Sequence, residues 1–564
     1  MRINKFTFMR YYLLVLFISA ILGIPSRAAE GFLNGKLLKI DMSDAVSERG
    51  GQSFSLSLSG LNSSSSVSLL GIERALAKAA EDDKIAAVYI NYDHFSAGIS
   101  SIEEIRGYLT RLSAAGKPVI AYGASLDNAS YYLASAADRV FLHPQGGGTL
   151  TGLASTQPFV KDLLDTLGID VQLIRHGKFK SAGEMYIRND ISPENREQYE
   201  VLLGSVWSTV LGQIAQSRRI SADTLSALVD NLSLSTAGTW LDKGLVDGLK
   251  YMDEMEKYLC HIFGVPKASQ VKTISISDYI GDLKKGPAKK KLAVIYANGE
   301  IVRSGGDIEG EKLARQIAKV RADSSVKAVV FRVNSPGGEV VAADMIRREI
   351  ELLGKTKPVV ASYGAYAASG GYLISAGCSR IFTDATTLTG SIGVFGMVPS
   401  FGRAIRKNLK VNMVSVGTNA HSAMGNGMQA LSDEEVAWYQ EEIEGIYDTF
   451  VGVVSEGRYM TKEAVDSIAQ GRVWAGKDAL EIGLADEKSS LLEAIEYAAG
   501  VAGLDKYRIV CYPEKKSFLD EIMGREDKKD APLVIAESLF KPGFSVMARM
   551  PYISIDTNKP TLHQ

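Results

Sequence analysis

Short apolar runs followed by amphipathic stretches recur along the chain. Two of them, "AAVYIN" (86–91) and "KAVVFRV" (327–333), have the length and the β-branched content of buried strands. Each is followed by a helical pattern and then by a second strand pattern, "KPVIAY" (117–122) or "KPVVASY" (357–363). Strands that alternate with helices indicate βαβ units and a mostly parallel sheet. The pattern therefore predicts an α/β protein.

The same pattern occurs twice, as an internal repeat. The stretch 116–141 matches the stretch 356–382 at an offset of 240 residues, and "TLTG" recurs at 149–152 and 387–390. Self-similarity over a fixed separation is the signature of a duplicated structural unit. We therefore expect two tandem domains of the same fold.

A lysine-rich segment separates the two copies. The stretch "KKGPAKKKLAV" (284–294) combines Pro and Gly with five lysines, which is typical of a solvated linker that leads into a new strand. We accordingly expect an N-terminal domain at 32–285 and a C-terminal domain at 290–510. The tail, 511–564, is polar and is expected to be loosely ordered, except that its stretch "SLFKPGFSVMARMPYISI" could dock on a neighbour.

The N-terminus has the pattern of an export signal. Arg2, Lys5 and Arg10 precede the apolar run 11–24, which is followed by "PSRAAE" with a possible cleavage site. Fourteen apolar residues are fewer than the ~20 that span a bilayer comfortably, so a cleaved signal and a retained anchor both stay open for the segment 1–29. Basic residues before the run hold that end in the cytoplasm. Either reading places the rest of the chain outside the cytoplasm.

The amino-acid composition excludes few classes of function. The chain has 46% hydrophobic residues, 23% charged residues and a net charge of −2, which gives no reason to expect nucleic acid as a partner. The three cysteines, Cys260, Cys378 and Cys511, form neither a disulfide framework nor a CxxC pair. No cofactor and no metal site is predicted.

The two copies differ at one serine and a pair of glycines. Ser369, in "GAYAASGGY" (364–372), corresponds to Ala129 in the first copy. The strand before it runs into "NSPGGEV" (334–340), whereas the first copy has no paired glycines at that point. Because the serine and the glycines are present together in one copy and absent together from the other, they indicate a functional unit.

A lysine shows the opposite distribution. "HGKFKSAGE" (176–184) aligns with "GTNAHSAMGN" (417–426), so that Lys180 lies opposite His421. Lys178, two residues earlier, is a rival for any role of Lys180. The first copy lacks the serine and the second copy lacks the lysine. This complementary distribution indicates a single site assembled from both halves.

These residues suggest a specific chemistry. A serine hydroxyl needs a base, and the sequence has neither a GxSxG nor an HExxH motif. A lysine can be that base only when burial keeps it neutral, and the apolar neighbours of Lys180 suit that condition. Ser369 and the glycines after it are expected to open a helix. The Gly370 amide, with an amide from Gly337 or Gly338, would then form an oxyanion hole.

At this point the sequence resembles a known family. "VNSPGG" (333–338), "GAYAASGGYLISAG" (364–377) and "TLTGSIGVFG" (387–396) are similar to the motifs of the signal peptide peptidase A (protease IV) family, in its long, double-domain form. The resemblance extends from the N-terminal apolar run to about residue 510.

The resemblance implies a Clp-protease-like, crotonase-related fold and a Ser/Lys dyad. By it, Ser369 is the nucleophile, Lys180 is the general base, and the hydroxyl of Ser391 helps to hold the lysine. It further implies a serine protease that degrades cleaved signal peptides, which are apolar peptide segments. Such an enzyme would be a homotetramer anchored in the bacterial inner membrane, with its catalytic domains on the periplasmic side.

Two other functions stay open on the sequence alone. A crotonase-type acyl-CoA enzyme would use a similar sheet and oxyanion hole, although an export signal argues against cytosolic CoA chemistry. A non-catalytic scaffold for membrane quality control would use the repeat only as structure.

Overall fold

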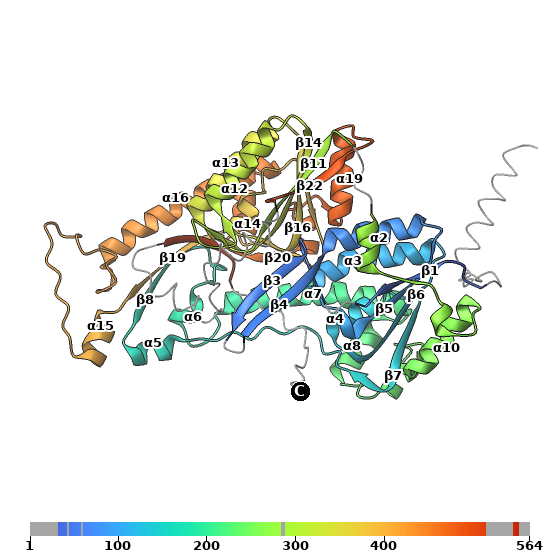
Figure 1. The fold of residues 1–564 in the computed structure, drawn as a ribbon. Coiled ribbons are helices and arrows are strands. Elements are labelled where there is room, and N and C mark those ends of the chain that lie inside the picture. Colours follow the sequence, from blue (N-terminus) through green and yellow to red (C-terminus); the bar gives the residue numbers. More distant parts are fainter. Residues whose placement is uncertain (1–31, 42–43, 58–59, 284–287, 515–544, 552–564) are drawn as a thin grey trace, which may run out of the picture.

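The computed structural model describes most of the chain, namely residues 32–41, 44–57, 60–283, 288–514 and 545–551. Figure 1 shows the two copies of the repeat as two layered units, with the C-terminal half above the N-terminal half. The predicted signal or anchor segment, 1–29, lies outside the described residues. Within the described part, no helix combines the length and the apolar character needed to cross a bilayer.

The N-terminal half is built on a parallel sheet. All neighbouring strands are parallel, in the order β10 (Thr273–Ser275), β1 (Lys36–Ile40), β5 (Ile85–Asn91), β6 (Val119–Leu126), β7 (Arg139–Gly148) and β9 (Gly248–Leu249). The apolar runs predicted as strands form β5 and β6. The parallel βαβ arrangement predicted from the sequence is thus confirmed in this half.

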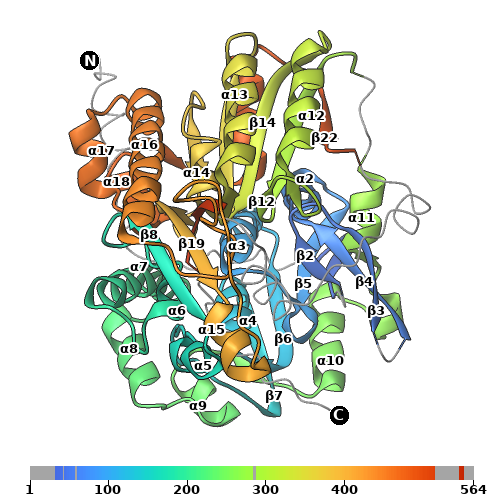
Figure 2. The ribbon, with the colours of Figure 1, turned by 90° about the vertical axis from the view of Figure 1, so that its left-hand side faces the viewer.

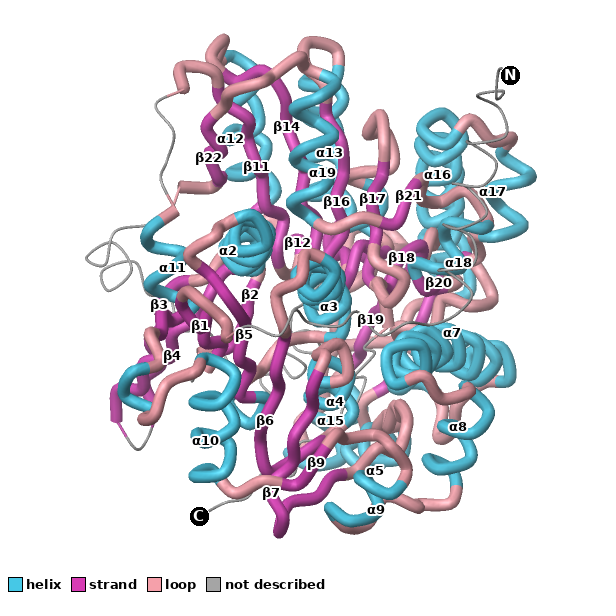
Figure 3. Tube along the Cα trace, turned by 90° about the vertical axis from the view of Figure 1, so that its right-hand side faces the viewer, coloured by secondary structure: helices cyan, strands magenta, loops and turns pink. Residues whose placement is uncertain are grey.

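The C-terminal half repeats this sheet. Its strands follow the same order, β22 (Arg508–Tyr512), β11 (Lys291–Asn298), β14 (Val326–Ser335), β16 (Val359–Ala368), β17 (Ile381–Thr383) and β21 (Glu487–Lys488), again all parallel. Two further strands, β18 (Leu388–Gly390) and β20 (Val473–Ala475), extend it beside β16. The last lysine of the lysine-rich segment, Lys291, is the first residue of β11. Figure 3 shows the two sheets, with α3 between them.

Helices cover the sheets at matching places in the two halves. In the first half they are α2 (Leu69–Glu81), α3 (Ile99–Ala114), α4 (Asn128–Ala134), α5 (Lys161–Leu167), α6 (Glu184–Ile187), α7 (Pro193–Arg218), α8 (Ala222–Asp230), α9 (Ala237–Asp242), α10 (Met252–Phe263) and α11 (Ile276–Asp282). In the second half they are α12 (Gly310–Ala322), α13 (Val340–Gly354), α14 (Gly370–Leu373), α15 (Gly402–Ala404), α16 (Asp433–Arg458), α17 (Lys462–Ile468), α18 (Gly476–Glu481) and α19 (Leu491–Val501). The longest, α7 and α16, both have 26 residues and serine N-caps, Ser192 and Ser432, 240 positions apart.

A third sheet contains strands from both halves and from the tail. Its order is β13 (Ile308–Glu309), β12 (Ile301–Val302), β15 (Gly337–Glu339), β23 (Ser545–Arg549), β19 (Val394–Ser400) and β8 (Asp170–His176). β8 belongs to the first half and pairs antiparallel with β19 over seven residues. Figure 2 shows these two strands side by side. This pairing ties the halves together. A separate small sheet contains β2 (Ala45–Ser47), β4 (Gly60–Ser68) and β3 (Gly51–Ser57).

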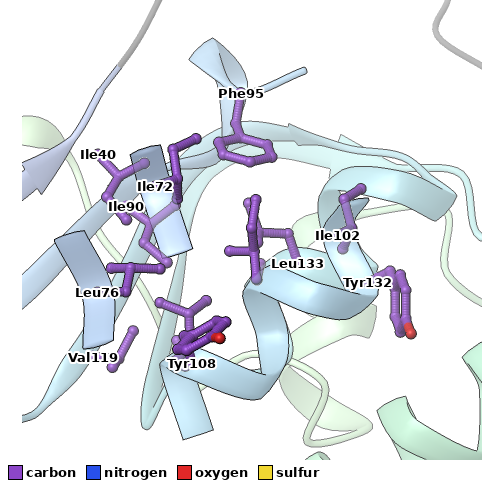
Figure 4. Packing of buried hydrophobic residues seen from close by; sticks show 14 of the residues in the cluster. Ile40, Ile72, Leu76, Ile90, Phe95, Ile102, Tyr108, Val119, Tyr132 and Leu133 are labelled. Atoms are coloured by element: carbon purple, nitrogen blue, oxygen red, sulfur yellow. The ribbon is translucent and has the colours of Figure 1, made fainter. Parts of the chain in front are cut away.

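The largest hydrophobic core also crosses the boundary between the halves. Most of it lies between α2, α3 and the first sheet, where Ile72, Leu76, Ile90 and Tyr108 pack together (Figure 4). The same cluster includes residues of β11, β14 and α19 from the second half. The apolar area buried in this cluster therefore stabilises the contact between the halves as well as the first half itself.

A buried ionic cluster lies at the same boundary. Arg332 on β14 donates from Nε and Nη2 to the two carboxylate oxygens of Glu48, at 2.8 and 3.0 Å, and from Nη2 to Glu104 on α3, at 2.7 Å. Its Nη1 donates to Ser362 Oγ and to the Tyr363 carbonyl. All three charged side chains are buried. One guanidinium therefore pairs with two carboxylates that come from the other half.

We expect Arg332→Met to destabilise the fold strongly, by about 3–5 kcal/mol, because the substitution leaves buried carboxylates without a cation. Urea denaturation measures the change. The matched control is Arg315→Met, which breaks an exposed pair with Glu311 on one helix and should change stability by about 0–1 kcal/mol. Similar small losses in both variants would contradict this role of the cluster.

Candidate active site

Ser369 lies at a sharp turn between β16 and α14. Its backbone has φ 55° and ψ −118°, a conformation that costs a residue with a side chain about 1–3 kcal/mol. Two hydrogen bonds hold the turn, since its N–H donates to the Gly390 carbonyl at 2.8 Å and its carbonyl accepts from Leu373 N at 2.9 Å. Ser369 is the N-cap of α14, so the helix start predicted here is confirmed, although the helix has only four residues.

The paired glycines of β15 lie against this turn. Gly337 has φ 98°, which favours glycine. A Cβ built on Gly370 would lie 3.2 Å from the Gly338 nitrogen, so the backbones of the two loops come close together. The N–H of Gly337 donates to Ser335 Oγ at 3.2 Å. Of the three amides predicted from the sequence, those of Gly338 and Gly370 are therefore the pair that lies together without this competing bond.

Lys180 reaches the serine from the other half of the chain. It follows β8, whose pairing with β19 brings the end of the strand beside the second sheet. Lys180 Nζ lies 2.8 Å from Ser369 Oγ, 3.1 Å from Ser391 Oγ and 3.2 Å from the Ser391 carbonyl. The structure thus brings together the three side chains that the sequence singled out.

The environment of Lys180 favours a neutral amine. The side chains of Lys180 and Ser369 are both 0% exposed. Burial lowers the pKa of Lys180 well below its ordinary value, and it is the one cause found for the shift among the described residues. The Phe395 ring lies 6.0 Å from Nζ. A buried lysine that is neutral can accept a proton from a hydroxyl at hydrogen-bonding distance.

The rival lysine is placed elsewhere. Lys178 is exposed, and its ammonium lies 5.0 Å from the centre of the Phe179 ring, away from the serine. His421, opposite Lys180 in the repeat, is bonded to Glu435 through Nδ1 at 3.1 Å. The geometry therefore favours Lys180 over Lys178.

A loop that the sequence did not single out packs around Lys180. The carbonyl of Gln470 accepts from Phe179 N at 2.9 Å, and a Cβ on Gly471 would lie only 2.6 Å from Lys180 Cβ. Arg472 accepts from Ser391 N at 2.7 Å through its carbonyl. Residues 470–472 thus contact both sides of the lysine. A glycine after a helix signals only a helix end, so the sequence gives little sign of this role.

The position in the first half that corresponds to Ser369 has a structural role. Ala129 stands there, and the adjacent Ser130 forms a capping box with Asp127, in which Ser130 N donates to Asp127 Oδ1 at 2.6 Å and Asp127 N donates to Ser130 Oγ at 2.7 Å. Ser130 Oγ itself donates to Asp127 Oδ1 at 2.8 Å, so this serine is engaged as part of a helix cap. The comparison of the two halves thus separates a serine beside a buried lysine from a structural serine.

No group of three or more His, Cys, Asp or Glu side chains in the described part of the chain is arranged to hold a metal ion. The chemistry available at the described site is that of a hydroxyl, an amine and backbone amides.

Comparison with known proteins places this site in a family. The model for peptidase family S49 matches residues 111–261 and 351–505, one segment in each half. The chain belongs to peptidase family S49. It is accordingly a serine protease, and both matched segments contribute to the site, since Lys180 lies in the first and Ser369 in the second.

Relatives of this S49 protease match over most of its length. It is 35% identical to "Protease 4" of Haemophilus influenzae, over 77% of this chain and 72% of the relative, and 36% identical to "Protease 4" of Salmonella typhi, over 81% and 75%. It is also 32% identical to "Serine protease SPPA, chloroplastic" of Arabidopsis thaliana, over 78% of this chain and 66% of the relative. The similarity therefore extends across both halves.

The buried lysine makes a pH-dependent prediction for the protease. A lysine whose pKa is lower in the folded state releases a proton on folding at any pH between its folded and unfolded pKa values, and each unit of the pKa shift corresponds to about 1.4 kcal/mol. The unfolded chain keeps that proton up to about pH 10.4, so stability should rise with pH between the lowered folded pKa of Lys180 and this value. Lys180→Met has no proton to release. Its stability relative to wild type should be highest near pH 7 and should decline towards pH 10.

Urea denaturation of wild type and Lys180→Met at pH 7 and pH 9.5 measures this difference. Lys178→Met, at the exposed neighbour, is the control and should show no such trend. A stability difference between Lys180→Met and wild type that stays constant with pH would show that Lys180 is charged in the folded protein.

Proposed function

We propose that this serine protease hydrolyses apolar peptides with Ser369 as nucleophile and Lys180 as general base. The observation that carries the proposal is the 2.8 Å separation of the Lys180 amine and the Ser369 hydroxyl, both fully buried. A serine next to a neutral amine has the arrangement of an activated nucleophile. Membership of family S49 and the motif resemblance to signal peptide peptidase A support cleaved signal peptides as the substrates.

The proposed reaction follows the geometry. Lys180 takes the Ser369 proton as Oγ attacks the peptide carbonyl, and the amides of Gly338 and Gly370 donate to the oxyanion. The protonated Lys180 then gives its proton to the departing amine, and water hydrolyses the acyl-enzyme by the same steps. Ser391 holds the amine through its hydroxyl at 3.1 Å and its carbonyl at 3.2 Å.

We also propose the finer architecture and location implied by the resemblance. The two domains, at 32–285 and 290–510, would have Clp-protease-like, crotonase-related folds, which the repeated strand order supports. The segment 1–29 would hold the enzyme at the bacterial inner membrane, with both domains on the periplasmic side. This location would bring the protease to the apolar fragments that signal peptide cleavage leaves behind.

Covalent labelling tests the proposed roles. A small fluorophosphonate should label Ser369 in wild type, as detected by mass spectrometry, and should not label Ser369→Ala. Lys180→Ala should be labelled about 10²–10⁴-fold more slowly because the general base is lost. Lys178→Ala, which removes an exposed lysine two residues away, should be labelled like wild type.

The pH dependence of labelling distinguishes a role of Lys180 as the base from a purely structural role in the fold. The labelling rate should rise with pH and reach its plateau well below pH 10, since burial lowers the pKa of Lys180. Normal labelling of Lys180→Ala would refute the dyad. An acyl-CoA enzyme of the crotonase type would leave Ser369 unlabelled in every variant.

The proposed homotetramer is supported by an exposed apolar segment. Residues 410–416 follow α15 at the left edge of Figure 1 and correspond, at an offset of 240, to β8. β8 is paired within the chain, whereas Val414 and Val416 in this segment are 84% and 95% exposed. An exposed apolar stretch whose counterpart in the first half is a paired strand is suited to pairing with a second copy of the chain.

We expect the double variant Val414→Asp/Val416→Asp to shift the assembly to smaller species by disrupting this contact. Size-exclusion chromatography with light scattering measures the mass in solution. Val501→Asp, at another exposed valine on α19, is the matched control and should leave the mass unchanged. An unchanged mass in the double variant would exclude this segment from the interface.

A further inference from the structure

The loop that connects α17 to β20, residues 469–472, packs against the buried lysine. A Cβ built on Gly471 would lie 2.6 Å from Lys180 Cβ, and a Cβ built on Gly393 would lie 3.2 Å from Lys180 Cδ. The Gly471 N–H also donates to the Ile392 carbonyl at 2.8 Å. The 469–472 loop is therefore one wall of the space that the lysine side chain occupies.

A tyrosine and an aspartate of the second half hold this loop. Tyr447 on α16 donates its hydroxyl to Asp466 Oδ1 on α17 at 2.5 Å, and Gln470 Nε2 donates to the same oxygen at 2.5 Å. The main-chain N–H of Gln470 also donates to the Tyr447 hydroxyl at 3.4 Å. Gln470 has φ 53°, a backbone conformation that persists only where its surroundings impose it. Its main chain and its side chain are thus both bonded to the Tyr447–Asp466 pair.

Tyr447 also contacts the strand that leads to Lys180. Its ring stacks on His176 at the end of β8, with the ring centres 3.6 Å apart and an angle of 20° between the rings. His176 Nδ1 is in turn bonded to Glu444 Oε2 on α16 at 2.6 Å. α16 lies beside both β8 and α17 (Figure 2). Burial raises the pKa of the Tyr447 hydroxyl, so the group stays protonated at neutral pH and remains a donor.

The first half lacks this tyrosine–aspartate pair. The N-caps of α7 and α16 are 240 positions apart, and so are those of α8 and α17, which shows that the helices correspond. At the same offset, Trp207 stands in the place of Tyr447 and Ser226 stands in the place of Asp466. An indole has no hydroxyl and a serine has no carboxylate. The copy whose loop packs on the lysine is thus the copy that has the pair.

We propose that Tyr447 and Asp466 are positioning residues of the protease, which hold the 469–472 loop against Lys180 and keep water away from its amine. This role rests on the proposed function of Lys180 as general base and deepens it. Without the pair, Gln470 loses the bonds that fix its conformation, and the loop no longer closes over the lysine. A hydrated amine holds its proton more strongly, so a smaller fraction of it is available as a base at neutral pH.

The pH profile of Ser369 labelling by the small fluorophosphonate tests this role. The variants are Tyr447→Phe, which keeps the ring that stacks on His176, and Asp466→Ala. In both, the midpoint of the profile should move up by about one pH unit, so that labelling on the rising limb is about tenfold slower than in wild type. The plateau rates at high pH should stay within about twofold of wild type, because the neutral lysine is the same base in all three proteins.

Three further variants sharpen the test. Asp466→Asn keeps an acceptor oxygen and should shift the midpoint less than Asp466→Ala. The double variant Tyr447→Phe/Asp466→Ala should shift it no further than the larger of the two single shifts, because both residues act through one loop. The matched control is Tyr279→Phe, which breaks a tyrosine–aspartate bond of 2.8 Å to Asp82 in the first half and should leave the midpoint unchanged.

Hydrogen exchange of the Gly471 N–H follows the loop without any labelling of the serine. This amide should exchange faster in Tyr447→Phe and Asp466→Ala than in wild type, since the loop opens more often, and at the wild-type rate in Tyr279→Phe. Urea denaturation establishes that each variant is folded. If Asp466→Ala is not folded, Tyr447→Phe and Asp466→Asn are compared with the control in both measurements.

The outcomes separate this inference from the proposed function. If Lys180→Ala is labelled slowly, but the variants of the pair keep the wild-type midpoint or lose rate equally at every pH, the positioning role is wrong and the base stands. If Lys180→Ala is labelled like wild type, the proposed base is wrong, and the positioning role is wrong with it.

Discussion

The site depends on a buried lysine that has no carboxylate partner among the residues that the structure describes. A charged ammonium in such a place is unfavourable by several kcal/mol, so the group is driven towards its neutral form. Burial of Lys180 is in turn fixed by backbone pairing, because the seven-residue ladder between β8 and β19 carries the lysine from one half to the serine of the other. The chemistry of the site is therefore a consequence of how the two halves are joined.

The joining of the halves explains why a duplicated chain has one such site in its described part. The two parallel sheets have the same strand order, yet β8 is paired in the third sheet while the corresponding segment, 410–416, is exposed. The cluster of Arg332 with Glu48 and Glu104 adds a polar contact across the same boundary. Since each half keeps one partner of the Lys180–Ser369 contact, neither has the pair alone.

Much of the fold was predictable because apolar runs and the repeat are local signals. The strands β5, β6, β14 and β16 lie where their sequence patterns indicate them. Lys180 and Ser369 were predicted by comparing the two copies of the repeat. Each residue is present in only one copy, and this difference indicated a shared site although the sequence does not show which residues are in contact. The register of β8 on β19 was not predictable, since it is set by packing between residues more than 200 positions apart. The same applies to β23: the sequence indicates that its stretch of the tail could dock, but not which strand edges it meets.

Several residues with strained backbone conformations lie at the site. Among the described residues, seven that are not glycine have positive φ, and three of these, Ser369, Ser391 and Gln470, lie around Lys180. Each such conformation costs about 1–3 kcal/mol and persists only where its surroundings over-determine it. Here the surroundings include hydrogen bonds between loops: Phe179 N donates to the Gln470 carbonyl across the two halves, and Ser391 N donates to the Arg472 carbonyl within the second half. The strain is therefore carried by the interface between the halves, and any change that loosens this interface should move the lysine before it unfolds either sheet.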